Sequence, residues 1–225
     1  LDPRSSPLNI ITPRGSPLMY HDLNVRLSDN AAQNARMLDA LADLGYAVVA
    51  VNRQLPASTK FSAAEHAPQK LSHPRLTILT RLTLDINDAS QFHLFGKTTQ
   101  SVVFDYDILA ACVHTEKMFQ LALQTDFLDL ITLDFSSRLE FRIKRPQIGI
   151  ALDRGIHLEL CYSQLLSPSP SSRRSFIFNA AALTEASAGG NKRVLVFSSG
   201  ARDPVEGLRG AEDVAALGVL WGMGR

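Results

Sequence analysis

The sequence predicts an α/β protein with a TIM-like (β/α) barrel of seven parallel strands. Three observations indicate this fold class. Seven strand-like segments alternate with helical segments along the chain. Such alternation implies parallel strands that are joined by right-handed crossovers. The chain has 225 residues, of which 45% are hydrophobic and 20% charged, and single α/β barrels reach this length. We therefore expect a barrel one strand short of eight, distorted or truncated, in place of an open doubly wound sheet.

The beginning of the chain differs from the rest. Residues 1–18 contain four prolines and show no periodic pattern, so we expect a disordered leader there. Residues 19–225 are expected to form a single barrel domain. Met19 stands directly before the first strand-like segment, and our hypothesis is that it is the natural start.

The strand candidates are short apolar runs with many β-branched residues. The run at 46–52, YAVVAVN, is typical of a strand that is buried on both faces of a parallel sheet. The seven expected strands are 22–27, 46–52, 75–84, 108–113, 130–135, 156–161 and 194–197.

The helix candidates combine capping residues with apolar positions at helical spacing. Ser28, Asp29 and Asn30 offer caps for a helix with Met37, Leu38 and Leu41 on one face, which Gly45 ends. Thr115 is expected to cap a later helix. The expected helices are 31–44, 92–100, 116–125, 146–156, 173–187 and 210–221. Long loops are expected at 54–74 and at 167–172, where the sequence is SPSPSS.

Composition limits the compartment and the partners. Cys112 and Cys161 each lie in an apolar run, so we expect buried thiols in a reducing compartment. No uncharged apolar run of about 18 residues and no signal peptide is present, so no membrane span is expected. Residues 20–137 hold 9 Lys and Arg against 13 Asp and Glu, a net −4, whereas residues 138–209 hold 11 against 6, a net +5. This asymmetry indicates an anionic partner for the second part.

Cations gather in loops that should follow the carboxyl ends of the strands, where barrels place their functional residues. The stretch 139–155, LEFRIKRPQIGIALDRG, places three cations before Pro146 and a helix. Small residues at 198–201 let backbone N–H groups approach an anion. Together such loops would contact several phosphates of a nucleic acid, although each loop alone is more simply a solvated turn. The candidate nucleic-acid-binding residues are Arg138, Arg142, Lys144, Arg145, Arg173, Arg174, Ser198, Ser199 and Arg209.

Catalytic and metal-binding signals are weak. The nucleophile elbow, the P-loop and the dinucleotide-binding fingerprint are absent from the sequence, and Asp134 follows a strand without a paired carboxylate. The segment 21–26, HDLNVR, resembles the Asp-Leu-His-x-His metal motif of PHP-type barrel hydrolases. Asn24 and Arg26 stand where that motif has histidines, and arginine does not ligate a divalent cation. We expect no catalytic residue and no metal site in this chain.

Short motifs along the whole chain resemble one family, the barrel-type protein subunit of ribonuclease P. This thirty-kilodalton-class subunit is shared with ribonuclease MRP in eukaryotes. The resemblance covers about Met19 to the end of the chain. It rests on the order and spacing of segments at 22–25, 44–46, 50–52, 80–83, 141–146, 151–155, 159–162, 173–174, 198–201, 208–210 and 213–214.

The resemblance implies a TIM-like barrel related to PHP domains but without their metal site. It implies a non-catalytic subunit that binds and braces the catalytic RNA for 5′-leader removal from precursor tRNA, which the protein would contact indirectly. The implied partners are ribonuclease P RNA, MRP RNA, a small Pop5-type protein subunit and other ribonuclease P proteins, and no membrane. Mg²⁺ is expected with the RNA and no cofactor on this chain. The implied location is nuclear and nucleolar.

Two other functions stay open on the residues alone. The first is a PHP-type metal-dependent phosphoesterase, which Asn24 and Arg26 disfavour. The second is an unrelated small-molecule barrel enzyme, which the lack of a nucleophile–base set disfavours. Stoichiometric zinc or manganese in the purified protein would favour the phosphoesterase.

Overall fold

The structure of the chain is a computed structural model that describes residues 19–57, 66–95, 103, 105–187 and 191–222. The disordered leader predicted at 1–18 lies outside the described residues. Residues 96–100 of the helix predicted at 92–100 also lie outside the described residues. Its first four residues belong to a 3₁₀ helix, η2 (Ala89–Phe95).

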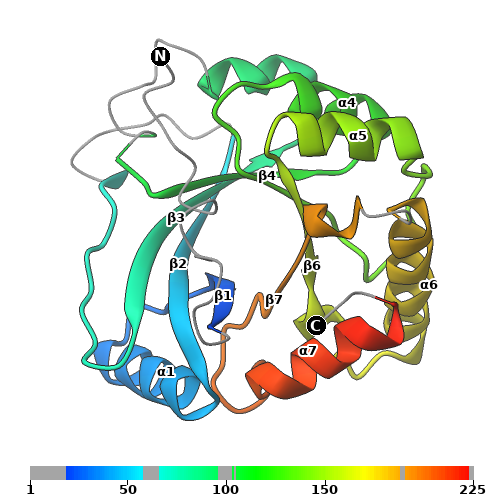
Figure 1. Cartoon of the computed structure of the whole chain (residues 1–225). Coiled ribbons are helices and arrows are strands. Elements are labelled where there is room, and N and C mark those ends of the chain that lie inside the picture. Colours follow the sequence, from blue (N-terminus) through cyan, green and yellow to red (C-terminus); the bar gives the residue numbers. More distant parts are fainter. Residues whose placement is uncertain (1–18, 58–65, 96–102, 104, 188–190, 223–225) are drawn as a thin grey trace.

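Seven parallel strands form one sheet and follow one another in chain order from β1 to β7, as the alternation of elements predicts. Every neighbouring pair in this order is parallel, and the sheet curves into a nearly closed barrel (Figure 1). The strands are β1 (Tyr20–Val25), β2 (Tyr46–Pro56), β3 (Thr77–Ile86), β4 (Ile108–Val113), β5 (Leu130–Thr132), β6 (His157–Cys161) and β7 (Leu195–Ser198).

The barrel closes between β1 and the segment that follows β7, without an eighth strand among the described residues. Val25 and Ala201 form an isolated parallel bridge, and the backbone N–H of Arg26 donates to the Ala201 carbonyl at 2.9 Å. The N–H of Ser199 donates to Asp22 Oδ1 at 3.0 Å. We call these contacts between residues 22–26 and 199–201 the seam. They compensate for the missing strand with side-chain and bridge hydrogen bonds.

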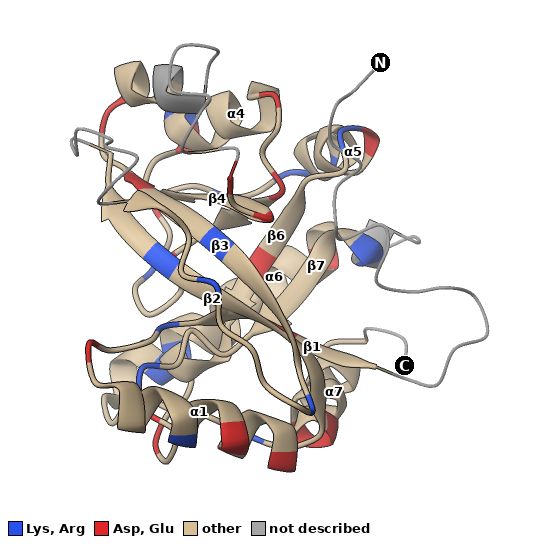
Figure 2. Cartoon of the chain, turned by 90° about the vertical axis from the view of Figure 1, so that its left-hand side faces the viewer, with Lys and Arg blue, Asp and Glu red and all other residues tan. Residues whose placement is uncertain are grey.

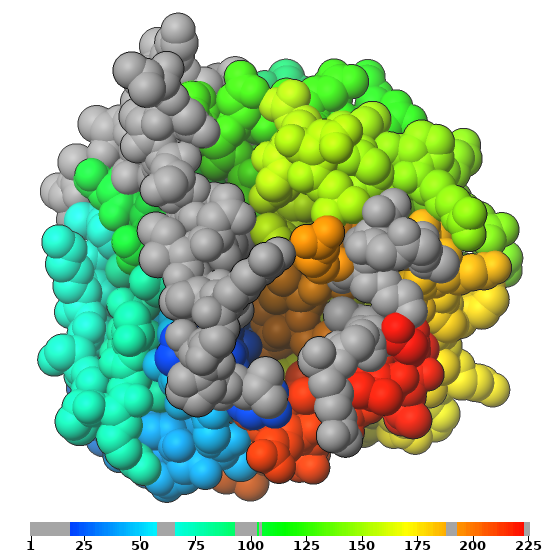
Figure 3. Space-filling model, in the orientation of Figure 1, coloured from blue at the N-terminus to red at the C-terminus, as the bar shows by residue number. Residues whose placement is uncertain are grey.

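Helices surround the barrel on its outside (Figure 1). In the space-filling view, α5, α6 and α7 form the outer surface on the right-hand side (Figure 3). None of the described helices is both long and apolar enough to cross a membrane. The helices are α1 (Ala31–Asp43), α4 (Glu116–Gln124), α5 (Arg145–Asp153), α6 (Pro170–Ala186) and α7 (Ala211–Leu220), with short 3₁₀ helices η4 (Tyr162–Gln164) and η5 (Asn191–Val194).

Local capping explains where two helices begin. The Asn30 side chain accepts the N–H groups of Ala32 and Gln33, so Asn30 is the cap among the three candidates at 28–30. Thr115 accepts the N–H of Met118, and its predicted cap is confirmed. The prediction of a loop at 167–172 is wrong for residues 170–172, which belong to α6. The Ser169 hydroxyl accepts the N–H of Ser172 and Pro170 occupies the first turn, so α6 begins there.

Other boundaries also differ from the prediction: β1 and β3 are each shifted by two residues, and β5 and α5 each end three residues early. The end of β2 shows a physical reason for such a difference. β2 continues to Pro56, three residues into the loop predicted at 54–74, because it stays paired with β3 as far as Asp85. The pairing partner, and not the composition of the segment, decides where this strand ends.

Two layers of apolar side chains hold the barrel together. The larger one fills the space between the sheet and the helices, and includes Phe119 of α4, Ile148 of α5 and Phe176 of α6, all fully buried. Trp221 extends it by stacking on Phe197 with ring centroids 5.8 Å apart. The smaller layer lies inside the barrel and consists of Leu23, Ala50, Ile108, Ala110 and Leu130. It leaves the carboxyl half of the barrel interior for polar residues.

Candidate functional site

Polar side chains fill the middle of the barrel, next to its apolar inner layer. Arg81 and Glu159 form an ion pair with both side chains fully buried, and Arg81 Nη2 donates to Glu159 Oε2 at 2.8 Å. They come from β3 and β6, on different sides of the barrel. We call the buried set the polar layer; its members are Asn24, Asn52, Arg81, Thr83, Thr132 and Glu159.

Hydrogen bonds satisfy the polar layer almost completely. Arg81 also donates to the Leu23 carbonyl at 2.6 Å, to Thr83 at 3.0 Å and to Thr132 at 3.1 Å. The remaining contacts join the amides and hydroxyls to one another: Asn24 Nδ2 to Glu159 Oε2 at 3.1 Å, Asn52 Nδ2 to Asn24 Oδ1 at 2.7 Å, and Thr83 Oγ1 to Asn52 Oδ1 at 2.8 Å. A buried network of this kind fixes the geometry of the strands around it.

The electrostatics of the pair keep both groups charged. Burial alone would raise the pKa of Glu159, but the Arg81 charge and the hydrogen bonds from Arg81 and Thr132 outweigh it and hold that pKa below its usual value. Burial alone would lower the pKa of Arg81, and Glu159 reverses that effect, so the pKa of Arg81 lies above its usual value. The centre of the barrel therefore contains a matched positive and negative charge.

These residues do not fit a metal ion. The guanidinium of Arg81 occupies the centre, offers only donors and repels a divalent cation. Asn24, which stands where a PHP-type motif has a histidine, uses its amide for Asn52, Glu159 and Cys161. No reaction step through a metal is derived for this chain.

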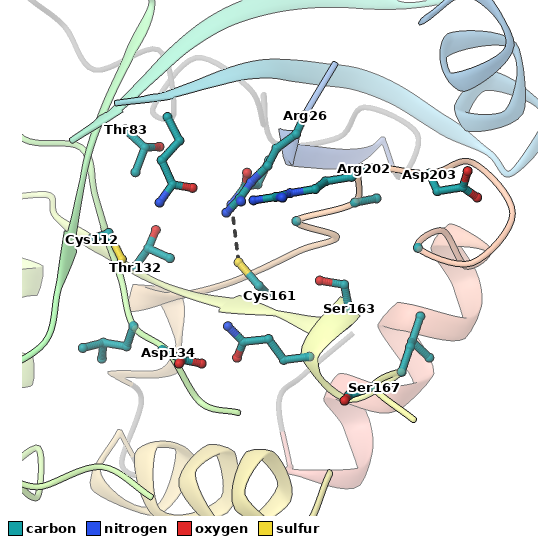
Figure 4. Close-up of a pocket in the computed structure, with 18 of the residues that line it drawn as sticks. Arg26, Thr83, Cys112, Thr132, Asp134, Cys161, Ser163, Ser167, Arg202 and Asp203 are labelled. Carbon is teal, nitrogen blue, oxygen red and sulfur yellow. Dashed lines mark hydrogen bonds between the residues drawn. The ribbon is translucent and has the colours of Figure 1, made fainter. Parts of the chain in front are cut away.

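A cavity of about 540 Å³ opens at the carboxyl ends of the strands, above the polar layer (Figure 4). Its walls come from several strands and from the loops that follow them. The charged side chains lining it are Arg26, Asp85, His114, Asp134, Arg202, Asp203 and Glu206. This is where a barrel enzyme would hold its substrate.

One cluster in this cavity has the composition of a metal site. Ligand atoms of Asp85, Cys112 and His114 lie within 4.8 Å of one another. The His114 ring is already hydrogen-bonded to Asp85 at 2.6 Å. Burial, followed by the Asp85 charge, raises the pKa of the Cys112 thiol to about 12, so the free thiol keeps its proton at neutral pH. Cys112 is half-buried and lines the cavity, which corrects the expectation that both thiols are buried, whereas Cys161 is buried as expected.

The predicted serines lie in the wall of the barrel. Ser198 and Ser199 are 1% and 0% exposed. The N–H of Ser199 donates to Asp22, and its hydroxyl donates to the Asn24 carbonyl at 3.2 Å. The contacts of Ser199 hold the seam, and the anion that its backbone N–H meets is the Asp22 carboxylate.

The basic turn before α5, Arg138–Arg145, lies on the outside of the barrel. Arg138, Arg142, Lys144 and Arg145 are all exposed. Arg142 lies 3.6 Å from Glu185 of α6, and Lys144 lies 3.8 Å from Glu116 of α4. Lys144 is the N-cap of α5, where its N–H donates to the Gln147 side chain at 2.8 Å. Arg138 and Arg142 also line a hollow against the carboxyl half of α6.

The other predicted cations are exposed but lie apart from this turn. Arg173 and Arg174 are in the first turn of α6, about 16 Å along the helix from Glu185. Arg173 donates to the Ser167 carbonyl at 2.8 Å, and Arg209 donates to the carbonyls of Glu206 and Leu208. The structure thus distributes the predicted cations along α6 and around α7 and does not gather them into one cluster.

Several residues of the site have no clear signal in the sequence. Arg81 and Glu159 are 78 positions apart, and no local pattern joins them. The sequence marks Arg26 only as a departure from the metal motif, and Arg202 is not a candidate, although both line the cavity. The one available signal for Arg26 and Arg202 is that each lies in the loop that follows a strand, where a barrel places its functional residues.

The fold and the polar layer define a class of protein: a seven-stranded (β/α) barrel whose centre is an ion pair and not a metal-ligand set. The family model described as "RNase P subunit p30" matches residues 19–225. The chain therefore belongs to the p30 family of ribonuclease P subunits, as its motifs predict.

Curated relatives agree over most of the chain. Ribonuclease P protein subunit p30 of Mus musculus is 32% identical over 216 residues, which cover 91% of this chain and 78% of that protein. Ribonuclease P/MRP protein subunit RPP1 of Saccharomyces cerevisiae is 29% identical over 210 residues, which cover 88% of this chain and 67% of that protein.

Solved structures agree on the fold. A chain of archaeal ribonuclease P with mature tRNA superposes with a TM-score of 0.64 at 14% identity, covering 88% of this chain and 81% of that chain. Histidinol phosphate phosphatase of Lactococcus lactis, solved with zinc, L-histidinol and phosphate, gives a TM-score of 0.52 at 12% identity, covering 92% and 95%. The predicted relation to the PHP-type barrel is confirmed as one of fold.

Proposed function

We propose that this chain is a non-catalytic protein subunit of ribonuclease P, and of ribonuclease MRP, that binds and braces the catalytic RNA for 5′-leader removal from precursor tRNA. The polar layer is the observation that carries this proposal. Its Arg81–Glu159 pair occupies the barrel centre, where a metal-dependent relative would need ligands and an open coordination position. The family to which the chain belongs supplies the ribonucleoprotein context.

The exposed cations are the proposed RNA contacts. Arg142 and Lys144 pair with Glu185 and Glu116 only through exposed side chains at 3.6 and 3.8 Å. Exposed pairs of this kind contribute little to stability, so phosphate oxygens can replace the carboxylates. The proposed RNA surface consists of Arg138, Arg142, Lys144, Arg145, Arg173, Arg174 and Arg209. The buried Ser198, at the end of β7, and Ser199, in the seam, support this surface from the barrel wall.

The names of the relatives support RNA and protein partners in these complexes, and the particular partners are part of the proposal. They are ribonuclease P RNA and MRP RNA, a small Pop5-type protein subunit and the other ribonuclease P proteins. The protein reaches precursor tRNA through the RNA. Mg²⁺ belongs to the RNA in this proposal, and the location is the nucleus and nucleolus.

The second candidate, a PHP-type phosphoesterase, rests on the fold and on the Asp85, Cys112 and His114 cluster. Arg81 and Arg26 disfavour it, because they place positive charge in the interior and at the mouth of the same barrel. The cluster also offers only three ligands, one of them a protonated thiol.

Affinity purification of the tagged chain from its own cells tests the proposal. We expect ribonuclease P RNA, MRP RNA and a Pop5-type subunit in the eluate, together with Mg²⁺-dependent processing of precursor tRNA. Nuclease treatment of the eluate should abolish that processing, because the RNA performs the chemistry.

The isolated chain provides the complementary test. Purified without RNA, it should not cleave precursor tRNA at any Mg²⁺ concentration. Cleavage that follows the protein through successive columns, and that survives nuclease treatment, would contradict the non-catalytic role. An eluate without either RNA would contradict the assignment to these complexes.

A further inference from the structure

Two arginines meet at the mouth of the barrel. Arg26 follows β1, and Arg202 follows the seam. Both line the 540 Å³ cavity at the carboxyl ends of the strands. Figure 4 shows their side chains entering the cavity from different segments and ending near each other, close to Cys161.

Neither arginine has an ion-pair partner among the described residues. The Nε atom of Arg26 is buried and has no hydrogen-bond partner in the described part of the chain. A buried guanidinium donor without an acceptor is unfavourable, because it loses its contact with water without compensation. This donor points to a ligand that supplies an acceptor.

The charges around Arg26 strengthen this expectation. Burial lowers the pKa of Arg26 most, and the positive charge of Arg202 lowers it next, with a further contribution from Arg81. Glu159 acts in the opposite sense, but its carboxylate already binds Arg81. Arg26 therefore lies near two other guanidinium groups, those of Arg202 and Arg81, whose positive charges both oppose its own.

The carboxylates in the same cavity are held by other partners. Asp85 binds His114 at 2.6 Å, and Asp134 accepts the N–H and hydroxyl of Ser136. Asp203 accepts two backbone N–H groups of its own loop, at 2.8 and 3.1 Å. Glu206, the remaining acid of the lining, is exposed. None of these four acids forms an ion pair with Arg26 or Arg202 in the described part of the chain, so the donors of the two guanidinium groups are available to an incoming anion.

We propose that the barrel mouth is a phosphate-binding site in which Arg26 and Arg202 together hold one phosphate group. A phosphate offers several acceptors to two planar donor groups, which suits arginine. The cavity volume is in the range of sites for small ligands, so it accommodates a nucleotide around that phosphate. The site is separate from the exposed cations of α5 and α6, and it does not depend on the ribonuclease P assignment.

The phosphate has two possible sources, a free nucleotide or the 5′ end of an RNA. Both are probed with the purified full chain by ¹⁵N-NMR of the arginine Nε–H groups and by calorimetry. The probes are inorganic phosphate, guanosine 5′-monophosphate, guanosine, and an RNA trinucleotide with a 5′-phosphate or a 5′-hydroxyl. We expect the Arg26 Nε–H resonance to move downfield with each phosphate monoester and with inorganic phosphate, and to stay in place with guanosine.

A comparison of the affinities for the mononucleotide and for the trinucleotide identifies the source of the phosphate. Tighter binding of the 5′-phosphorylated trinucleotide than of the mononucleotide assigns the site to an RNA end, and equal binding assigns it to a free phosphate compound. Both results support the site.

Three variants make the test decisive. Arg202→Gln, at an exposed position, should weaken phosphate and nucleotide binding roughly tenfold or more, because it removes charge-assisted hydrogen bonds. Arg26→Gln should act similarly and also removes the NMR reporter. Arg193→Gln is the matched control, since Arg193 is exposed in η5 before the amino end of β7. Absence of binding by the wild type, or equal affinity in Arg202→Gln and Arg193→Gln, would overturn the proposal.

Discussion

Arg81 and Glu159 are the residues on which the barrel interior depends most. Both side chains are fully buried, and neighbouring polar groups from several strands bond to them. A buried pair of this kind adds little net stability compared with an apolar pair of similar size. Removing one member is different, because the other is left as an unpaired charge in the interior.

Arg81→Met should therefore destabilise the fold strongly. We expect a loss of about 3–5 kcal/mol in the free energy of unfolding, because Glu159 stays buried without its partner. The double variant Arg81→Met with Glu159→Met should recover a large part of that loss. Urea unfolding of the wild type, both single variants and the double variant gives the coupling energy. Additive losses would mean that the two charges stabilise the protein independently.

Asp22 should make the stability of the fold depend on pH with the opposite sign from that of Glu159, because the two pKa values are shifted in opposite directions. Burial raises the pKa of Asp22 above its usual value, although hydrogen bonds from Ser199 and Asn24 partly oppose this. The folded state then keeps a proton that the unfolded state has lost, from the ordinary Asp pKa of about 3.9 upward to the raised value. The contribution of Asp22 to the free energy of unfolding therefore decreases as the pH rises through that window, and it is constant at higher pH.

Asp22→Asn should remove this slope. Its side-chain oxygen can still accept the N–H groups that Asp22 Oδ1 accepts from Asn24 and Ser199. We expect the variant to gain stability relative to the wild type as the pH rises from about 4 toward neutrality. The measurement is urea unfolding of both proteins at several pH values. A difference that is independent of pH would show that Asp22 ionises normally in the folded state.

Single residues are predictable where their role is local. Asn30 and Thr115 cap the helices that the sequence assigns to them, because a cap involves only the next three residues. Asn24 is recognisable in the sequence as a departure from the PHP-type motif. Its actual partners, Asn52 and Glu159, are 28 and 135 residues away, and no spacing rule connects them.

At the scale of elements, α5 combines a capped start with exposed charges. Its N-cap bonds use the backbone of Lys144 and the side chain of Gln147, with an N–H to Oε1 distance of 2.8 Å. The guanidinium groups of the neighbouring Arg142 and Arg145 therefore take no part in the hydrogen bond that caps the helix. They can change partner, from carboxylate to phosphate, without loosening the helix.

Replacing Arg142, Lys144 and Arg145 with Ala should weaken RNA binding and leave the fold intact. The logarithmic salt dependence of the affinity should fall by about one for each phosphate that the variant no longer binds. The measurement is binding of ribonuclease P RNA at several salt concentrations, with circular dichroism as the check on folding. Arg193→Ala is the single-charge control. An unchanged affinity and salt slope would remove this turn from the RNA surface.

Element boundaries show where sequence patterns stop being informative. The seven strands lie close to where their apolar runs predict, since a strand buried in a parallel sheet needs such a run. β2 is longer than expected because its length depends on its pairing with β3, which lies elsewhere in the chain. α6 begins early because the serines and prolines of SPSPSS suit a capped first turn as well as a loop.

At the scale of the whole molecule, charge is distributed unevenly. Asp43 at the end of α1 and Glu212 and Asp213 at the start of α7 line the same hollow, and Figure 2 shows the acidic residues of α1 and α7 at one end of the barrel. The exposed cations of α5 and of the start of α6 lie elsewhere, whereas Arg209, the remaining proposed RNA contact, directly precedes Gly210 of this hollow. RNA approaching the protein should therefore be oriented toward α5 and α6 and repelled by the acidic end.

The purified protein should contain no stoichiometric zinc or manganese. The reason is the positive charge of Arg81 and Arg26 in and above the barrel centre, together with the hydrogen bond that already joins His114 to Asp85. Elemental analysis after dialysis checks this. If zinc is found at one ion per chain, loss of that zinc in Cys112→Ser would locate it at the Asp85, Cys112 and His114 cluster and restore the metalloenzyme alternative.

The seam also determines when this fold can be completed. It joins Asp22 to Ser199, which are 177 positions apart, so a ribosome makes one side long before the other. Until then β1 pairs with β2 on one edge and leaves its second edge open. An open edge of this kind can recruit a strand from another nascent chain. A chain terminated before Ser199 should consequently fail by aggregating during synthesis, even though its helices from α1 to α6 are already made.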